Sequence, residues 1–199
     1  MMIKNDIVRR RLLAYIIDVF IVSFIVGIIL VGRDTRVDEA RSRDLMKLID
    51  DYSNETIDTD EYLNKYSNII YETNQDNFND NLVYFVIGVG YFLIFQFLNG
   101  GCSIGKKLMK IRIVSNDKKD IKFWQLLIRV CLINEILPML LLLIFTKILS
   151  GYSFLIGYGS VSILRNLIVI ICGLTLLLSK SHISFHDRLS NSQVIEDGK

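Results

Sequence analysis

The fold is decided by residues 9–18, which read Arg9-Arg10-Arg11-Leu12-Leu13-Ala14-Tyr15-Ile16-Ile17-Asp18. Three arginines end where a run of apolar residues begins, and that run (residues 12–31) contains a single charge, Asp18. At the helical rise of about 1.5 Å per residue, such a run is about 30 Å long, which matches the hydrocarbon core of a bilayer. The stretch therefore predicts a membrane-spanning helix that begins beside a basic anchor.

Further apolar runs along the chain predict further membrane spans. The chain is 51% hydrophobic yet 22% charged, and it contains a single proline. These figures are compatible because the charges lie outside the apolar runs, and scarce proline favours long helices. We predict an all-α, polytopic membrane helix bundle with about four transmembrane helices, and a bundle of three spans is the alternative. The predicted spans lie near residues 12–32, 82–99, 131–149 and 163–178.

Residues 33–81 differ in composition from the rest of the chain. They contain six basic and thirteen acidic residues, a net charge of −7. Apolar residues recur in them at helical spacing, and Asp58 with Glu61 resembles a capping box. We expect a small helical insertion of two short amphipathic helices outside the membrane, within a single membrane domain that covers residues 1–199.

The basic segments predict the orientation of the chain. Residues 1–11 carry four basic residues and one acidic residue, and residues 100–122 carry seven basic and two acidic residues. Four spans place both segments on the same side of the membrane, and basic loops concentrate on the cytoplasmic side. We therefore expect a protein of the cell membrane with both termini in the cytoplasm, whose basic loop contacts anionic lipid headgroups.

Asp18 is the unusual residue of the first span, because a carboxylate at that depth costs about 2.5–3.5 kcal/mol. Arg11 lies two helical turns away, roughly 10 Å along the axis, so the two side chains cannot pair directly. We expect Asp18 to pair with Arg129, or Glu135 to pair with a cytoplasmic base. Two roles for Asp18 remain open at this point: a hydrogen-bond acceptor in helix packing, or a binding site for a cation or proton.

Residues 100–107 read Gly100-Gly101-Cys102-Ser103-Ile104-Gly105-Lys106-Lys107. They fit the first seven positions of a phosphate-binding loop, but Lys107 stands where that loop needs Ser or Thr for magnesium, and an apolar helix replaces the preceding strand. Nucleotide hydrolysis is therefore excluded. What remains is a flexible turn that leads into a basic surface segment, and residues 110–114 suit either a strand or a helix.

The remaining polar residues give little sign of catalysis. His182 and His186 have a spacing that occurs in metal sites, but a polar juxtamembrane segment is the stronger interpretation. Cys102, Cys131 and Cys172 are widely separated and odd in number, which argues against a disulfide framework. We expect neither a cofactor, a metal, an enzymatic activity nor a nucleic-acid partner.

Three motifs together resemble those of the RDD family of small bacterial membrane proteins, which is named for one arginine and two aspartates. They are Arg11-x-x-Ala14-x-x-Ile17-Asp18, the glycine-lysine loop of residues 101–108, and the closing segment at residues 186–194. The resemblance implies Arg11, Asp18 and Asp187 as signature residues, with Arg10 as a less favoured candidate for the arginine. In the loop it points to Gly101, Ser103, Gly105 and Lys106. Ser103 replaces a usual threonine and Lys110 a common glycine.

Two classes of function compete on this basis. The family resemblance implies transport of a small cation or proton. Asp18 would be the binding group, with Arg129, Glu135 and His186 as helper or pairing residues, and four spans are few for a carrier, so we expect an oligomer. The alternative is a non-enzymatic accessory or scaffold protein that binds a protein partner through residues 33–81 or through the basic loop.

Overall fold

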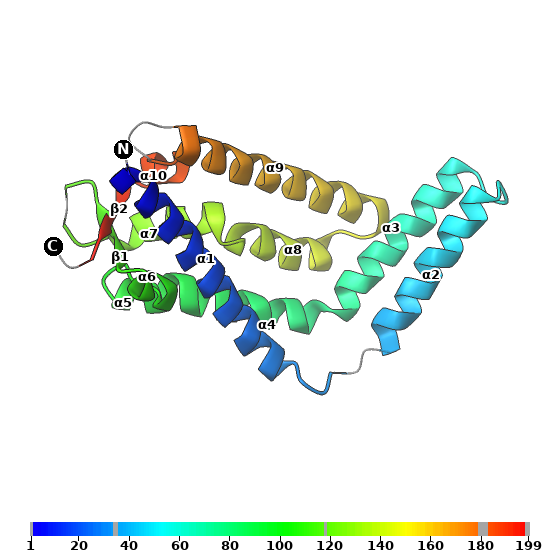
Figure 1. The fold of residues 1–199 in the computed structure, drawn as a ribbon. Coiled ribbons are helices and arrows are strands. Elements are labelled where there is room, and N and C mark those ends of the chain that lie inside the picture. Colours follow the sequence, from blue (N-terminus) through cyan, green and yellow to red (C-terminus); the bar gives the residue numbers. More distant parts are fainter. Residues whose placement is uncertain (1, 34–35, 118, 179–182, 198–199) are drawn as a thin grey trace.

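The computed structural model describes residues 2–33, 36–117, 119–178 and 183–197. Figure 1 shows a bundle of long helices with both termini near one end and a helical hairpin projecting from the other. We call these the terminal end and the hairpin end. The predicted all-α membrane helix bundle is confirmed. The elements are α1 (Met2–Ile29), α2 (Arg36–Ser53), α3 (Thr59–Asp76), α4 (Phe78–Gly88), the π-helix η1 (Val89–Phe95), α5 (Gln96–Leu98), α6 (Ile104–Leu108), β1 (Ile111–Ser115), α7 (Phe123–Ile133), α8 (Ile136–Ile148), α9 (Gly151–Leu178), α10 (Phe185–Leu189) and β2 (Ser192–Glu196).

Three helical segments of the described residues are long and apolar enough to cross a membrane. They are Asp6–Ile29 of α1, the continuous run Phe78–Leu98 through α4, η1 and α5, and Gly151–Leu178 of α9. A fourth crossing is formed if α7 and α8 count as one span, although their axes differ by 70°. Many large apolar side chains of these helices face outward, as lipid contact requires. The chain is a multi-pass membrane protein.

The last span begins earlier than the sequence suggests. Residues 151–162 lie outside the predicted span at 163–178, but they are helical and form the first turns of α9. Glycine and serine remain helical here because the segment packs on α3, where the rings of Tyr71 and Phe154 meet edge to face with centroids 5.5 Å apart. Arg165 consequently lies near the middle of α9, where it pairs with Glu135 of the broken span.

The predicted span at 131–149 is broken between α7 and α8. The break lies at Asn134 and Glu135, and Glu135 adopts a left-handed conformation with φ 60°. Pro138 stands in the first turn of α8, where its missing N–H is tolerated. Its ring would clash with the carbonyl four residues earlier in a continuous helix, which is that of Asn134. The proline therefore determines the break without lying in it.

The acidic segment forms the helical hairpin of α2 and α3. Asp58 caps α3 by accepting a hydrogen bond of 2.8 Å from the Glu61 backbone N–H, as its spacing suggested. Arg41 of α2 pairs with Glu72 and Asp76 of α3. The far end of the hairpin projects away from the bundle (Figure 1), whereas the later turns of α3 pack on α9.

A small antiparallel sheet closes the terminal end. Strand β1 pairs with β2 in the register Ile113 to Val194, which resolves the ambiguity at residues 110–114 in favour of a strand. Ile113 is buried in the apolar core formed by α1, η1 and α7, and Val194 packs against that core. The sheet thereby ties the loop after α5 to the C-terminal segment, and it brings α6 and α10 to the same end of the bundle.

Candidate functional site: two buried charge clusters

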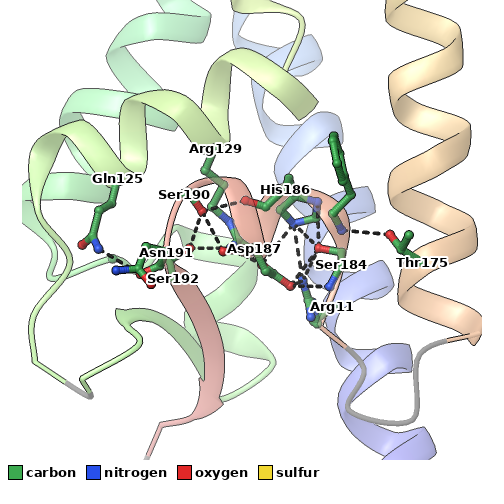
Figure 2. Close-up of polar contacts among 12 residues, drawn as sticks. Arg11, Gln125, Arg129, Thr175, Ser184, His186, Asp187, Ser190, Asn191 and Ser192 are labelled. Carbon is green, nitrogen blue, oxygen red and sulfur yellow. Dashed lines mark hydrogen bonds and ion pairs between the residues drawn. The ribbon is translucent and has the colours of Figure 1, made fainter.

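The first cluster is centred on Asp187 of α10, which binds two arginines from different helices (Figure 2). Its Oδ2 accepts a hydrogen bond of 2.6 Å from Arg11 of α1, and its Oδ1 pairs with Arg129 of α7. Arg129 also donates to Ser192 Oγ at 3.1 Å. The side chains of Arg11, Arg129 and Asp187 all have exposed fractions of 10% or less. We call them the Arg-Asp-Arg cluster.

Local sequence around α10 fixes the orientation of Asp187. The Ser184 backbone N–H and hydroxyl donate to Asp187 Oδ2 at 3.0 and 2.8 Å, which forms a capping box at the start of the helix. The Phe185 backbone N–H donates to Thr175 Oγ1 at 2.8 Å and attaches α10 to α9. Contacts with its own helix therefore orient the carboxylate in addition to the two arginines (Figure 2).

The electrostatics of this cluster favour ionised Asp187 beside neutral His186. Burial opposes ionisation of Asp187, but the positive charge of Arg129, a hydrogen bond from His186 and the charge of Arg11 together hold its pKa well below the usual range. Burial and the nearby charge of Arg129 lower the pKa of His186 to about 4. The imidazole is uncharged at neutral pH, so the charges there are those of the two guanidinium groups and one carboxylate.

The second cluster is centred on Asp18, which is completely buried in α1. Oδ1 accepts hydrogen bonds from Tyr91 Oη at 2.6 Å and from the Gly105 backbone N–H at 2.8 Å. Oδ2 accepts one from Ser103 Oγ at 2.5 Å and lies 3.6 Å from Lys106 Nζ. Both carboxylate oxygens are thus occupied by protein donors from η1, α6 and the glycine-lysine loop.

The π-helix η1 and the buried polar residue that follows it both contribute to this second cluster. The π-helix η1 carries Tyr91, and such helices are frequent at functional positions. Just beyond it, Gln96 is buried and accepts a hydrogen bond of 3.3 Å from Lys106 Nζ. Burial lowers the pKa of Lys106 to about 8, although the negative charge of Asp18 favours the protonated amine.

The pairing predicted from the sequence between Asp18 and Arg129 is wrong. Arg129 binds Asp187, and Asp18 is satisfied by α6 and η1. Glu135 does not pair with a cytoplasmic base either, because its partner is Arg165 of α9. The short helix α6 accounts for the difference, since its close approach to α1 supplies donors that helical spacing alone does not reveal.

Two cavities share a wall at the break between α7 and α8. One, of about 260 Å³, extends from Arg11 and His186 at the terminal end to Arg165. The other, of about 210 Å³, lies between α1, α4 and the start of α8 and reaches Glu135. Tyr15 and Asn134 line both cavities. The Glu135–Arg165 pair therefore stands where the two cavities adjoin.

Comparison with known families agrees with these motifs. Residues 7–191 match the RDD family, and this range includes both clusters and the hairpin of α2 and α3. The chain belongs to the RDD family. No curated protein and no solved structure matches the chain.

In this RDD protein the three signature residues do not form one site. Arg11 and Asp187 pair directly, while Asp18 belongs to the neighbouring cluster with Lys106. Within the glycine-lysine loop, Ser103, Gly105 and Lys106 surround Asp18. Gly101 instead lies against β1, where an added Cβ would stand 2.2 Å from the Ile113 carbonyl oxygen.

Other residues of this RDD protein belong to the clusters without having been predicted to do so. Tyr91 could not be singled out from the sequence, because a tyrosine within an apolar run is usually a packing residue. Gln96 was visible as an isolated polar residue in its run, and Ser184 stands three residues before Asp187 at capping-box spacing. Among the described residues no group of His, Cys, Asp and Glu could hold a metal ion. His182, the partner proposed for His186 in the metal interpretation, lies outside the described residues.

Proposed function

We propose that this RDD protein moves a small cation or a proton across the cell membrane, without a chemical step, and that Glu135 is the carboxylate that binds it. The observation that carries the proposal is the position of Glu135 at a helix break between two cavities. Non-helical backbone within a membrane is tolerated where it lines a cavity, and broken helices in transporters hold ion sites. This assigns to Glu135 the role that the sequence suggested for Asp18.

The two carboxylates differ in their capacity for a ligand. Asp18 is buried and accepts four protein contacts, so a cation would have to displace donors from η1 and α6. The Glu135 side chain is 56% exposed, and Arg165 is its ion-pair partner. Arg165 would act as an internal competitor, which is released when a cation or proton occupies the carboxylate.

The proposal includes orientation and assembly. The terminal end lies in the cytoplasm, because the basic segments gather there, and the hairpin lies outside. Several copies work together, since three or four spans offer little room for a pathway within one chain. The outward apolar surface of α9 is available for such association.

The test is cation-driven proton flux into liposomes, measured with an enclosed pH-sensitive dye. Glu135→Gln is expected to lose the flux, and Arg165→Gln to retain it, since the carboxylate is then free of its competitor. Glu39→Gln, an exposed carboxylate of the hairpin, is the matched control. Equal loss in Glu135→Gln and Arg165→Gln would assign the pair to structure alone, and flux retained in Glu135→Gln would overturn the proposal.

The hairpin supports a second candidate function as a partner-binding scaffold. Helix α2 packs on α3, and the pair projects beyond the bundle with a strongly acidic composition (Figure 1). Such a surface suits a basic protein partner outside the membrane. Binding of a candidate partner should persist in Glu135→Gln and be lost when the projecting part of the α2–α3 hairpin is removed. That result would distinguish this function from transport.

A further inference from the structure

The 260 Å³ cavity at the terminal end has an unusual lining. Four basic residues contribute to it, and no carboxylate is among the described residues that line it. The basic residues are Arg11, Lys106, Arg129 and Arg165. A cavity whose charged walls are all of one sign attracts an ion of the opposite sign, so the lining favours an anion.

The ion pairs behind the wall leave positive charge at the cavity. Lys106 is matched by Asp18, and Arg165 by Glu135. Arg11 and Arg129 both bind the single carboxylate of Asp187. Among the described residues, three carboxylates thus lie within contact of four cationic groups around this cavity, and this ratio favours a further anion. Guanidinium groups bind phosphate oxygens well because their N–H donors match them in geometry.

Arg165 provides an independent observation at the other end of the cavity. Its Nε is buried and has no hydrogen-bond partner among the described residues. A buried donor without an acceptor costs about 1–3 kcal/mol. Because Arg165 lies at the end of the cavity away from Arg11, a ligand that satisfies this group must carry a second acceptor beyond an anionic group bound at Arg11, as the ester oxygens of a phospholipid do.

Most of the other lining residues are apolar, and some of them are exposed on the side that faces the bilayer. Leu12 of α1 and Val169 of α9 line the cavity and are exposed on the outside of the bundle. Helix α1 packs on α4 and α6, whereas α9 packs on α3, α7, α8 and α10, so the two helices diverge around the cavity (Figure 1). An apolar chain can therefore extend from the charged end into the surrounding lipid.

We propose that this cavity is a binding site for an anionic phospholipid, with the phosphate held by Arg11, Arg129 and Lys106 and an acyl chain lying between α1 and α9. The basic groups lie at the terminal end of two spans, which is where lipid headgroups are found. A free phosphate ion would satisfy the charges but would leave the apolar wall unused. The lipid would occupy one of the two cavities beside the Glu135–Arg165 pair, but its binding does not depend on the transport proposed for Glu135.

Two glycines of α9 give a matched pair of variants that leave every charge in place. Gly173 lines the cavity, and an added Cβ there meets nothing within 4 Å, so Gly173→Leu would occupy the cavity without a backbone clash. Gly159 lies on the same helix, is equally open, and is not among the lining residues. Gly159→Leu is therefore the control for adding a leucine to α9.

The experiment is native mass spectrometry of the purified protein with phosphatidylglycerol and with phosphatidylcholine of the same acyl chains. We expect the wild type and Gly159→Leu to prefer the anionic lipid by about tenfold, which corresponds to about 1.4 kcal/mol, and Gly173→Leu to lose that preference. Melting temperatures of the two variants should agree in lipid-free detergent. A second arm adds inorganic phosphate to the lipid-free protein.

Three results would overturn the proposal. They are equal retention of both lipids by the wild type, an anionic preference that survives in Gly173→Leu, and thermal stabilisation by inorganic phosphate without any lipid preference. The last result would assign the cavity to a soluble oxyanion. None of these measurements depends on ion flux. A failure of the lipid-binding proposal can therefore be distinguished from a failure of the transport role proposed for Glu135.

Discussion

Asp187 combines several contacts that a shorter or neutral side chain would not provide. It caps α10 through Ser184 and pairs with an arginine from α1 and another from α7. Because the carboxylate and both guanidinium groups are largely buried, removing its charge costs much more than removing a surface ion pair. A single residue therefore connects three helices at the terminal end.

Asp187→Asn should destabilise the protein by about 3–5 kcal/mol, because it leaves two buried cations without this counter-charge. Adding Arg129→Gln should recover part of the loss. The measurement is the melting temperature in detergent, with Asp117→Asn, an exposed carboxylate, as the control. Equal stability of the single and double variants would contradict the charge argument.

His186 should make stability depend on pH in the mildly acidic range. Its pKa is about 4 in the folded protein and about 6.5 when unfolded, so the unfolded chain binds a proton that the folded chain does not. Stability should therefore fall as pH falls, by roughly 1.5 kcal/mol between pH 6.5 and 5. Melting temperatures across this range should vary less in His186→Gln. An unchanged slope in that variant would assign the pH dependence to another group.

At the scale of elements, the short helix α6 is seated unusually close to α1. An added Cβ at Gly105 would lie 2.3 Å from the Ala14 carbonyl oxygen and 2.7 Å from Asp18 Oδ1. The same approach lets the Gly105 backbone N–H donate to Asp18. Glycine is required here for the contact between two elements, whereas Lys110, in a left-handed conformation with φ 53°, occupies a turn position where the family commonly has glycine.

Gly105→Ala should separate α6 from α1 and cost about 1–3 kcal/mol, since neither backbone nor carboxylate can move without losing a hydrogen bond. Gly27→Ala on α1, where an added Cβ meets nothing within 4 Å, should be neutral or slightly stabilising. The yield of monodisperse protein and its melting temperature would measure both effects. Equal behaviour of the two variants would show that α6 can shift without loss.

At the scale of the whole molecule, the hairpin is partly a projection and partly a component of the bundle. The later turns of α3 cover α9, and Phe154 is completely buried beneath them. At the far part of the hairpin the rings of Tyr52 and Tyr62 stack across the two helices, and the exposed ion pair of Lys65 with Glu61 lies within α3 and contributes little to stability. Removal of the two parts should therefore have different consequences.

Replacing residues 48–64 with a short Gly-Ser linker should leave the melting temperature of the bundle nearly unchanged. Deleting residues 38–78 should lower it sharply, because exposing Phe154 and the helix surface around it loses about 3 kcal/mol or more. Thermal unfolding of both truncations, followed by circular dichroism, would test this. Comparable stability of the two would mean that α3 contributes nothing to the bundle.

The sequence by itself determined the membrane helix bundle and the acidic helical insertion, and its resemblance to the RDD family pointed to Arg11, Asp18 and Asp187. These follow from local information, namely apolar runs long enough to span lipid, segregated charge and motif order. Only the tertiary structure decided which charges pair. Asp18 binds Lys106, Arg129 binds Asp187, and Glu135 binds Arg165, because a π-helix, a broken span and the short α6 set the distances between helices. Ion pairing depends on those distances, and no periodicity within a single helix encodes them.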